Sequence, residues 1–162
     1  MSHGRNLKIA ASGDREIVMT REFDAPRQLV FDTFTKPQLI QRWLLGPEGW
    51  TMPVCEVDLK VGGSYRYVWR RDTDGTEMGM GGVYREVVPP ERLVHTHKFD
   101  QAWYAGESLT TTILVELGGR TTMTATMLYE SREARDGVLK SGMERGVAAS
   151  YDRLEAILAA SK

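Results

Sequence analysis

Residues 23–31 read FDAPRQLVF, and this short stretch contains the change from strand to helix that decides the fold. Pro26 suits the first turn of a helix, because its fixed φ fits there and its missing N–H would have no intrahelical partner anyway. The apolar residues that follow it have helical spacing. We therefore predict that a strand over 16–23 ends here and that a helix begins at Pro26.

The segments on either side of this boundary contain further turn signals. Residues 6–11 are predicted to pair with 16–23 as a hairpin around the polar turn at 12–14. Pro37 is predicted to open a second short helix, and Gly46-Pro47 ends it because neither residue favours helix continuation. Two short helices are therefore expected before the next strand.

Residues 50–129 change to a period of two, the side-chain period of a strand. Tyr67 and Trp69, for example, oppose Arg66 and Arg70. Turn signals divide the region at 72–75, 89–90 and 118–119. This pattern predicts an antiparallel meander with one covered face and one face in water.

Residues 131–160 return to helical spacing. One apolar stripe is formed by Val138, Leu139, Met143, Val147, Tyr151, Leu154 and Leu158. Gly142 and Gly146 lie within it, although glycine costs about 1 kcal/mol relative to alanine in a helix. Close approach of a ligand or of the sheet would explain both glycines, and so would two tolerated weak spots. We predict one long helix over the covered face of the sheet.

The composition is that of one globular domain. A chain of 162 residues buries roughly 70% of its unfolded surface, which is enough for a real core. No run approaches the roughly 18 apolar residues of a membrane span, and the N-terminus has no signal-peptide core. We expect a single cytoplasmic domain over 1–162, with residues 1–5 disordered.

The charge pattern and the cysteine count exclude several partners and sites. The net charge is −1 with acids and bases interspersed, so nucleic acid and membrane surfaces are not expected as partners. Cys55 is the only cysteine, which excludes an internal disulfide and a cysteine-based zinc cluster. We favour a buried strand cysteine over a reactive thiol. A homodimer is compatible with the sequence, but no heptad repeat requires one.

Several motifs occur in a fixed order along the chain. They are FDAPRQLVF at 23–31, Arg42-Trp43, Gly46-Pro47, DLKVGGSY at 58–65, and Gly146-Val147 followed by SYDRL at 150–154. In this order and spacing, over about 7–158, the chain resembles the SRPBCC (START-like) superfamily. Within it, the resemblance is to the branch named after the C-terminal domain of the heat-shock-protein-90 ATPase activator, and to CalC-like proteins.

The resemblance implies an α+β helix-grip fold, in which a curved antiparallel sheet wraps around a long C-terminal helix and two short helices lie near the N-terminus. We interpret the most family-like residues as fold determinants rather than as chemistry. They are Pro26, Trp43, Asp58, Gly62 and Gly63. Fold alone does not fix function, so function has to be argued from a site.

The resemblance also implies a mostly apolar small molecule held between helix and sheet. Sheet parity and side-chain type nominate its lining as Tyr67, Trp69, Met78, Met80, Tyr84, Met123 and Met127 from the sheet, with Met143 and Val147 from the helix. Methionine and aromatic side chains adapt to irregular apolar ligands. The alternative is that these residues simply pack a filled core.

The loop over 100–107 carries two aromatic residues outside the predicted strands. Trp103 and Tyr104 are candidates for the cavity entrance, with Gly106 as a pivot, because a loop has less core to fill. An equally simple interpretation folds Trp103 back onto the sheet.

His95 and His97 are the only chemically versatile pair. Two residues apart on a strand, they project from the same face and are nominated as polar contacts in the cavity. A zinc site would need a third protein ligand, which the spacing does not supply, so neither a metal nor another cofactor is predicted. The alternative is that both histidines are ordinary strand residues.

Three functions compete. We favour a protein that binds a hydrophobic or aromatic small molecule. The second is an enzyme of the polyketide cyclase or dehydratase type, for which only His95, His97 and Glu86 could supply acid and base. The third is a co-chaperone that activates the heat-shock-protein-90 ATPase during the stress response, as the branch name suggests. No catalytic residue is predicted.

Overall fold

The computed structural model describes residues 7–100 and 106–160. The predicted disorder of residues 1–5 and the predicted entrance residues Trp103 and Tyr104 lie outside this range. The elements follow in the order β1 (Lys8–Ser12), β2 (Glu16–Phe23), α1 (Arg27–Thr35), α2 (Pro37–Trp43), β3 (Trp50–Val57), β4 (Ser64–Arg71), β5 (Glu77–Val88), β6 (Arg92–Phe99), β7 (Ser108–Leu117), β8 (Arg120–Leu128), α3 (Arg132–Lys140) and α4 (Met143–Ala160).

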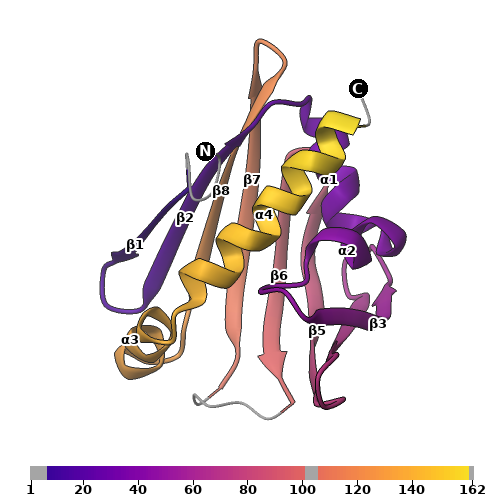
Figure 1. The fold of residues 1–162 in the computed structure, drawn as a ribbon. Helices are drawn as coiled ribbons and strands as arrows, with labels where there is room; N and C mark the ends of the chain where they lie inside the picture. Colours follow the sequence, from indigo (N-terminus) through magenta and orange to yellow (C-terminus); the bar gives the residue numbers. More distant parts are fainter. Residues whose placement is uncertain (1–6, 101–105, 161–162) are drawn as a thin grey trace.

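The strands form one eight-stranded sheet in the order β1-β2-β8-β7-β6-β5-β4-β3, and every neighbouring pair is antiparallel. From β3 to β8 each strand lies beside its successor, which confirms the predicted meander. Helix α4 crosses one face of the sheet diagonally, and α1 and α2 lie beside its C-terminal half (Figure 1). This is the helix-grip arrangement of the α+β class.

The strand-to-helix boundary lies where the sequence predicts it, with a shift of one residue. Pro26 has an extended ψ of 152° and is the N-cap, so α1 begins at Arg27 rather than at the proline. The carbonyl oxygen of Pro26 accepts hydrogen bonds from the N–H groups of Leu29 and Val30. Pro37 opens α2 as predicted.

The C-terminal helical region differs from the prediction of one long helix. It is divided into α3 and α4 at Ser141-Gly142. Gly142 has a φ of +82°, a conformation that other residues adopt only with strain, so its glycine is explained by the break. Ser141 terminates α3 by donating through Oγ to the carbonyl oxygen of Val138.

The C-terminal half of α4, which we call its anchored half, packs into an aromatic core. The Tyr151 ring stacks on that of Trp43 with centroids 5.8 Å apart, and it meets Phe23 edge-on at 5.7 Å. Trp43 in turn donates from Nε1 to the carbonyl oxygen of Thr33 at 2.7 Å. Leu154 is completely buried on the same side of the helix. This half of α4 is therefore fixed against both the sheet and the short helices.

Two arginines add polar contacts to the same half of α4. Arg153 donates from Nη1 to the carbonyl oxygen of Gly46 at 2.7 Å. Arg21 on β2 donates to Asp152 and Glu155 from a position that is 1% exposed. The C-terminal part of α4 is thus connected to β2 and to the loop after α2.

Within residues 7–100 and 106–160, no helix has the length and hydrophobicity that a membrane crossing requires.

Candidate ligand cavity

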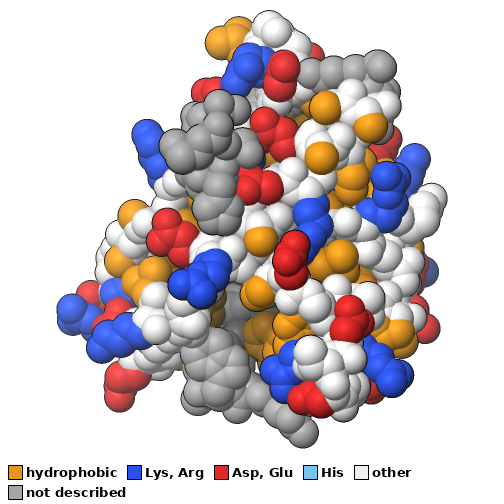
Figure 2. Space-filling model, in the orientation of Figure 1, with side chains coloured by type: hydrophobic (Ala, Val, Ile, Leu, Met, Phe, Trp, Pro, Cys, Tyr) orange, Lys and Arg blue, Asp and Glu red, His pale blue; other side chains and the backbone are white. Residues whose placement is uncertain are grey.

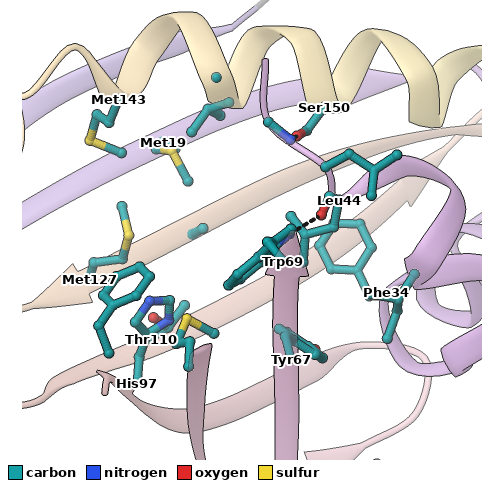
Figure 3. A pocket seen from close by; sticks show the side chains of 18 of the residues that line it. Met19, Phe34, Leu44, Tyr67, Trp69, His97, Thr110, Met127, Met143 and Ser150 are labelled. Atoms are coloured by element: carbon teal, nitrogen blue, oxygen red, sulfur yellow. Dashed lines mark hydrogen bonds between the residues drawn. The ribbon is translucent and has the colours of Figure 1, made fainter. Parts of the chain in front are cut away.

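A cavity of about 560 Å³ lies between the sheet and the N-terminal part of α4. The two layers do not fill the space where they diverge, so a gap remains under the first turns of α4. In the view of Figure 2 the surface is hollowed below α4, and hydrophobic side chains line the hollow. Figure 3 shows side chains from the sheet and from α4 pointing into the same space.

The structure brings together all but one of the nominated lining residues. Those that line the cavity are Tyr67, Trp69, Met78, Met80, Tyr84, His95, His97, Met127, Met143 and Val147. They come from β4, β5, β6, β8 and α4, which the order of the sheet and the course of α4 place around one space. Period-two parity on the strands and the apolar stripe on the helix identified these positions.

Met123 is the exception and has to be corrected. Its side chain points to the covered face, as its parity predicts, but it is completely buried and does not line the cavity. The Tyr151 hydroxyl approaches its Sδ at 3.4 Å, where α4 packs directly on β8. Met123 therefore belongs to the filled core beneath the anchored half of α4.

Sequence reasoning missed the contribution of the segment after α2. Leu44, Leu45, Gly46 and Pro47 all line the cavity, together with Phe34 and Trp43 from the helices before them. The sequence indicates Gly46-Pro47 as the end of a helix and as one of the ordered motifs, but no periodicity in so short a segment indicates where it points. The period-two pattern from β3 onward does not indicate that the segment after α2 packs against the cavity.

The wall formed by β4 and β5 is aromatic. Tyr67 lies 5.0 Å from Tyr65 and 5.9 Å from Trp69, as measured between ring centroids. Trp69 donates from Nε1 to the carbonyl oxygen of Leu44 at 2.7 Å, which fixes its ring beside the segment after α2 (Figure 3). Burial raises the pKa of Tyr67 and of Tyr84, so both hydroxyls stay protonated at neutral pH.

The side of the cavity formed by β6 and β7 carries two histidines and two threonines. His95 approaches the Tyr65 hydroxyl through Nδ1 at 3.1 Å, and Tyr65 donates to the carbonyl oxygen of Thr96 at 2.6 Å. Burial lowers the pKa of His97 to about 3, and it lowers that of His95 as well. Both imidazoles are therefore neutral at physiological pH. Thr110 and Thr112 face the same space from β7.

The lining carries no formal charge among the described residues: no lysine, arginine, aspartate or glutamate contributes to it. Glu86, considered above as an acid or base, is exposed and accepts from Nε of Arg92 at 2.8 Å. It lies on the surface and not in the cavity. The cavity can therefore hold an apolar body and form a few neutral hydrogen bonds.

The structure offers little for metal or thiol chemistry. Among the residues it describes, no three histidine, cysteine, aspartate or glutamate side chains are grouped so that they could hold a metal ion. Cys55 is only partly exposed on β3, and burial raises its pKa to about 11, with Glu56 adding to the shift. A thiol with so high a pKa is a weak nucleophile at neutral pH.

Solved structures share the fold over almost the whole chain. A protein of Rhodobacter sphaeroides matches with 30% identity and a TM-score of 0.90, over 96% of this chain and 99% of that one. A protein of Nitrosomonas europaea matches with 24% identity and a TM-score of 0.81, over 93% and 98% of the two chains. A Plasmodium falciparum protein described as an HSP90 activator matches with 22% identity and a TM-score of 0.65, over 90% and 96%.

The comparison with curated proteins gives no significant match. The family model described as "Activator of Hsp90 ATPase homolog 1-like protein" matches residues 24–159, which includes both short helices, the meander and α4. The chain therefore belongs to the family of Activator of Hsp90 ATPase homolog 1-like proteins.

Proposed function

We propose that this protein binds an apolar small molecule in the cavity between the sheet and α4. The observation that carries the proposal is the cavity of about 560 Å³ with a lining of uncharged, mostly apolar side chains. Ligand pockets are commonly about 300–1,000 Å³, with hydrophobic and aromatic walls and a few polar groups. A filled core would have no reason to leave such a space, because protein interiors are normally close-packed.

The expected affinity follows from the area that a ligand would bury. Burying about 300 Å² of apolar ligand surface contributes about 7 kcal/mol before the entropic cost of association. Because micromolar binding needs about 8.2 kcal/mol net, a ligand that buries only this much apolar surface should bind with a dissociation constant well above micromolar. The methionines that line the cavity, among them Met78, Met127 and Met143, allow it to adapt to more than one shape.

A thermal-shift screen tests the proposal. Hydrophobic and aromatic compounds that bind the folded state should raise the unfolding midpoint, and at equal concentration a tighter ligand should raise it more. Compounds that shift it should lose their effect when the cavity is filled by substitution. A chemically varied set that shifts nothing, together with an experimental structure in which the space is filled, would refute a binding function.

A second function is favoured by the family itself. The matching family is described by its likeness to an activator of the Hsp90 ATPase, and the Plasmodium falciparum neighbour is described as an HSP90 activator. Stimulation of the chaperone ATPase by the purified protein would support this function. It would act through a surface, so filling the cavity should leave the stimulation unchanged.

Acid–base catalysis in the cavity has less support. A general base works best with a pKa near the operating pH, whereas burial lowers the pKa of His97 to about 3. The described lining contains no carboxylate to act with it. We therefore place the cyclase or dehydratase function behind the other two.

A further inference from the structure

The histidines and threonines of the cavity gather on one side. His95 and His97 on β6 lie next to Thr110 and Thr112 on β7, and His95 is the direct cross-strand partner of Thr110. In Figure 3 His97 and Thr110 point into the space from the same side as Met127. The opposite walls are aromatic or apolar apart from Ser141 and Ser150, and these two hydroxyls are already bonded to the backbone of Val138 and Gly46. A ligand therefore meets side chains that still offer hydrogen bonds mainly along the β6–β7 edge.

The hydrogen bonds of His95 fix its tautomer. Tyr65 has one hydroxyl proton, and its 2.6 Å partner is the carbonyl oxygen of Thr96, which can only accept. Nδ1 of His95 lies 3.1 Å from the Tyr65 oxygen and 3.2 Å from the same carbonyl oxygen, so it must be the donor to both acceptors. A neutral imidazole protonated at Nδ1 leaves Nε2 as an acceptor with a free lone pair.

The tautomer of His97 is not fixed by hydrogen bonds of this kind. Neither of its ring nitrogens has a hydrogen-bond partner among the residues that the structure describes; its ring contact is with Phe99, 5.3 Å away between centroids. A neutral imidazole carries one acceptor nitrogen in either tautomer. A polar group that faces an apolar cavity without a partner costs free energy, which a ligand can recover by hydrogen bonding to it.

The described lining of the cavity offers no fixed charge to an ionic ligand. None of the described lining residues is charged, and both histidines stay neutral because burial lowers their pKa. A carboxylate or ammonium would therefore lose its hydration without meeting a fixed counter-charge, and protonating a buried imidazole to supply one would itself cost free energy.

We propose that the ligand of this cavity is an uncharged, largely aromatic or aliphatic molecule with a hydroxyl or similar donor, and that this donor bonds to the free ring nitrogen of His97, with Nε2 of His95 as the neighbouring acceptor. This inference rests on the proposed binding function and specifies its chemistry. The apolar walls supply affinity, whereas His97 selects a donor over a plain hydrocarbon and the uncharged lining excludes ions.

Pyrene, 1-hydroxypyrene and pyrene-1-carboxylate test the inference, because they share one fluorescent ring system and differ in one substituent. Titrated by fluorescence at neutral pH, 1-hydroxypyrene should bind about three- to tenfold more tightly than pyrene, the usual value of one net hydrogen bond. Pyrene-1-carboxylate should bind at least about tenfold more weakly than pyrene.

His97→Phe is the informative variant, since it keeps a ring and removes both nitrogens. It should bring the preference for 1-hydroxypyrene over pyrene to about one while leaving pyrene affinity within about twofold. Lys98→Gln is the matched control, because Lys98 is the next residue on β6 and is exposed. It should keep the wild-type preference.

The outcomes separate the two levels of the proposal. Failure of all three pyrenes and of the thermal-shift screen would refute the binding function itself. Binding of pyrene with no gain for 1-hydroxypyrene, equal binding of the carboxylate, or a preference that survives His97→Phe would overturn the ligand chemistry and leave the binding function standing. If His97→Phe does not fold, the ¹⁵N shifts of the wild-type His97 ring decide: they should move with 1-hydroxypyrene and not with pyrene.

Discussion

Arg21 donates from Nη2 to Oε1 of Glu155 at 2.6 Å, and this contact links β2 with the C-terminal half of α4 across 134 positions of the sequence. The same nitrogen reaches Asp152 at 3.3 Å. The guanidinium also lies over the rings of Phe23 and Tyr151, at 5.5 and 5.8 Å from their centroids. Arg21 is 1% exposed, and its Nε and Nη1 have no hydrogen-bond partner among the described residues.

Arg21→Met tests the energetic balance of this buried charge. The two carboxylates remain 24% and 33% exposed, so water can still reach them when the arginine is gone. Because two buried donors lack partners, we expect the free energy of unfolding of Arg21→Met to stay within about 1 kcal/mol of wild type, or to rise. Arg21→Ala should lose about 2–4 kcal/mol through the cavity it creates. Urea denaturation measures both, and a large loss in the methionine variant would mean that the ion pair is net stabilising.

Met143→Trp and Val147→Trp should fill the cavity. Both side chains point into it from the first turns of α4, so an indole there occupies the space a ligand needs. We expect affinity for pyrene to fall at least about tenfold, with the unfolding free energy changed by no more than about 1–3 kcal/mol. Glu144→Trp is the control, since Glu144 is exposed on the same helical turn. Unchanged binding in both cavity variants would place the site elsewhere.

The free energy of unfolding should decrease as the pH is lowered through a window set by His97. Burial lowers its pKa from 6.5 to about 3, so between these values the unfolded state binds a proton that the folded state does not. The contribution of His97 to the free energy of unfolding is therefore fully present above pH 6.5. It decreases as the pH falls toward 3, by up to about 1.4 kcal/mol per pH unit. His95 shifts in the same direction.

The comparison of wild type with His97→Phe isolates this contribution. Asp100 and Asp136 have lowered pKa values because of their arginine partners, and they also lose stabilisation in acid, but equally in both proteins. Urea unfolding at pH 7 and pH 5 should show a smaller loss in the phenylalanine variant. Equal losses would mean that His97 is protonated in the folded state at pH 5.

Two glycines should respond to alanine with opposite signs. At Gly82 an added Cβ would overlap the carbonyl oxygen of Thr96 on the paired strand, so Gly82→Ala should lower the unfolding free energy by about 2 kcal/mol or more. At Gly146 the Cβ would meet Cδ of Pro47 at 3.4 Å, an ordinary contact. Gly146→Ala should therefore gain up to about 1 kcal/mol from helix propensity. Thermal or urea unfolding of the two variants checks the signs.

The fold was predictable because its signals are periodic. The period-two alternation from β3 to β8, Pro37 at the start of α2 and the apolar stripe of the C-terminal region are all read from spacing. The break at Gly142 was not, because the stripe continues across it from Leu139 to Met143 and the sequence does not reveal a φ of +82°. A glycine within an amphipathic pattern is equally compatible with a helix that continues.

Which face of a strand is covered was harder to predict than the alternation itself. In β7 the exposed face carries Ile113, Val115 and Leu117, and the covered face carries Thr110 and Thr112. Hydrophobicity alone would choose the opposite orientation. Thr110 and Thr112 face the cavity beside His95 and His97 instead of packing under α4, and which strand positions face that space depends on where α4 leaves the sheet.

For the same reason parity nominated the cavity lining but could not define its limits. Met123 and Met127 have identical parity on β8, yet Met123 lies under the packed half of α4 and Met127 beside the gap. The division depends on the angle at which the helix crosses the sheet. That angle is set by contacts between distant residues, such as Arg153 with Gly46, for which the sequence has no local pattern.

Different turns of helix α4 have different roles. The contacts of Tyr151, Arg153 and Glu155 hold its C-terminal half, whereas Met143 and Val147 near its start face the hollow. Mutations in those opening turns can reshape the chamber without touching the anchor. Sequence changes there can therefore alter the shape of the proposed binding site across generations while the folded state is inherited unchanged.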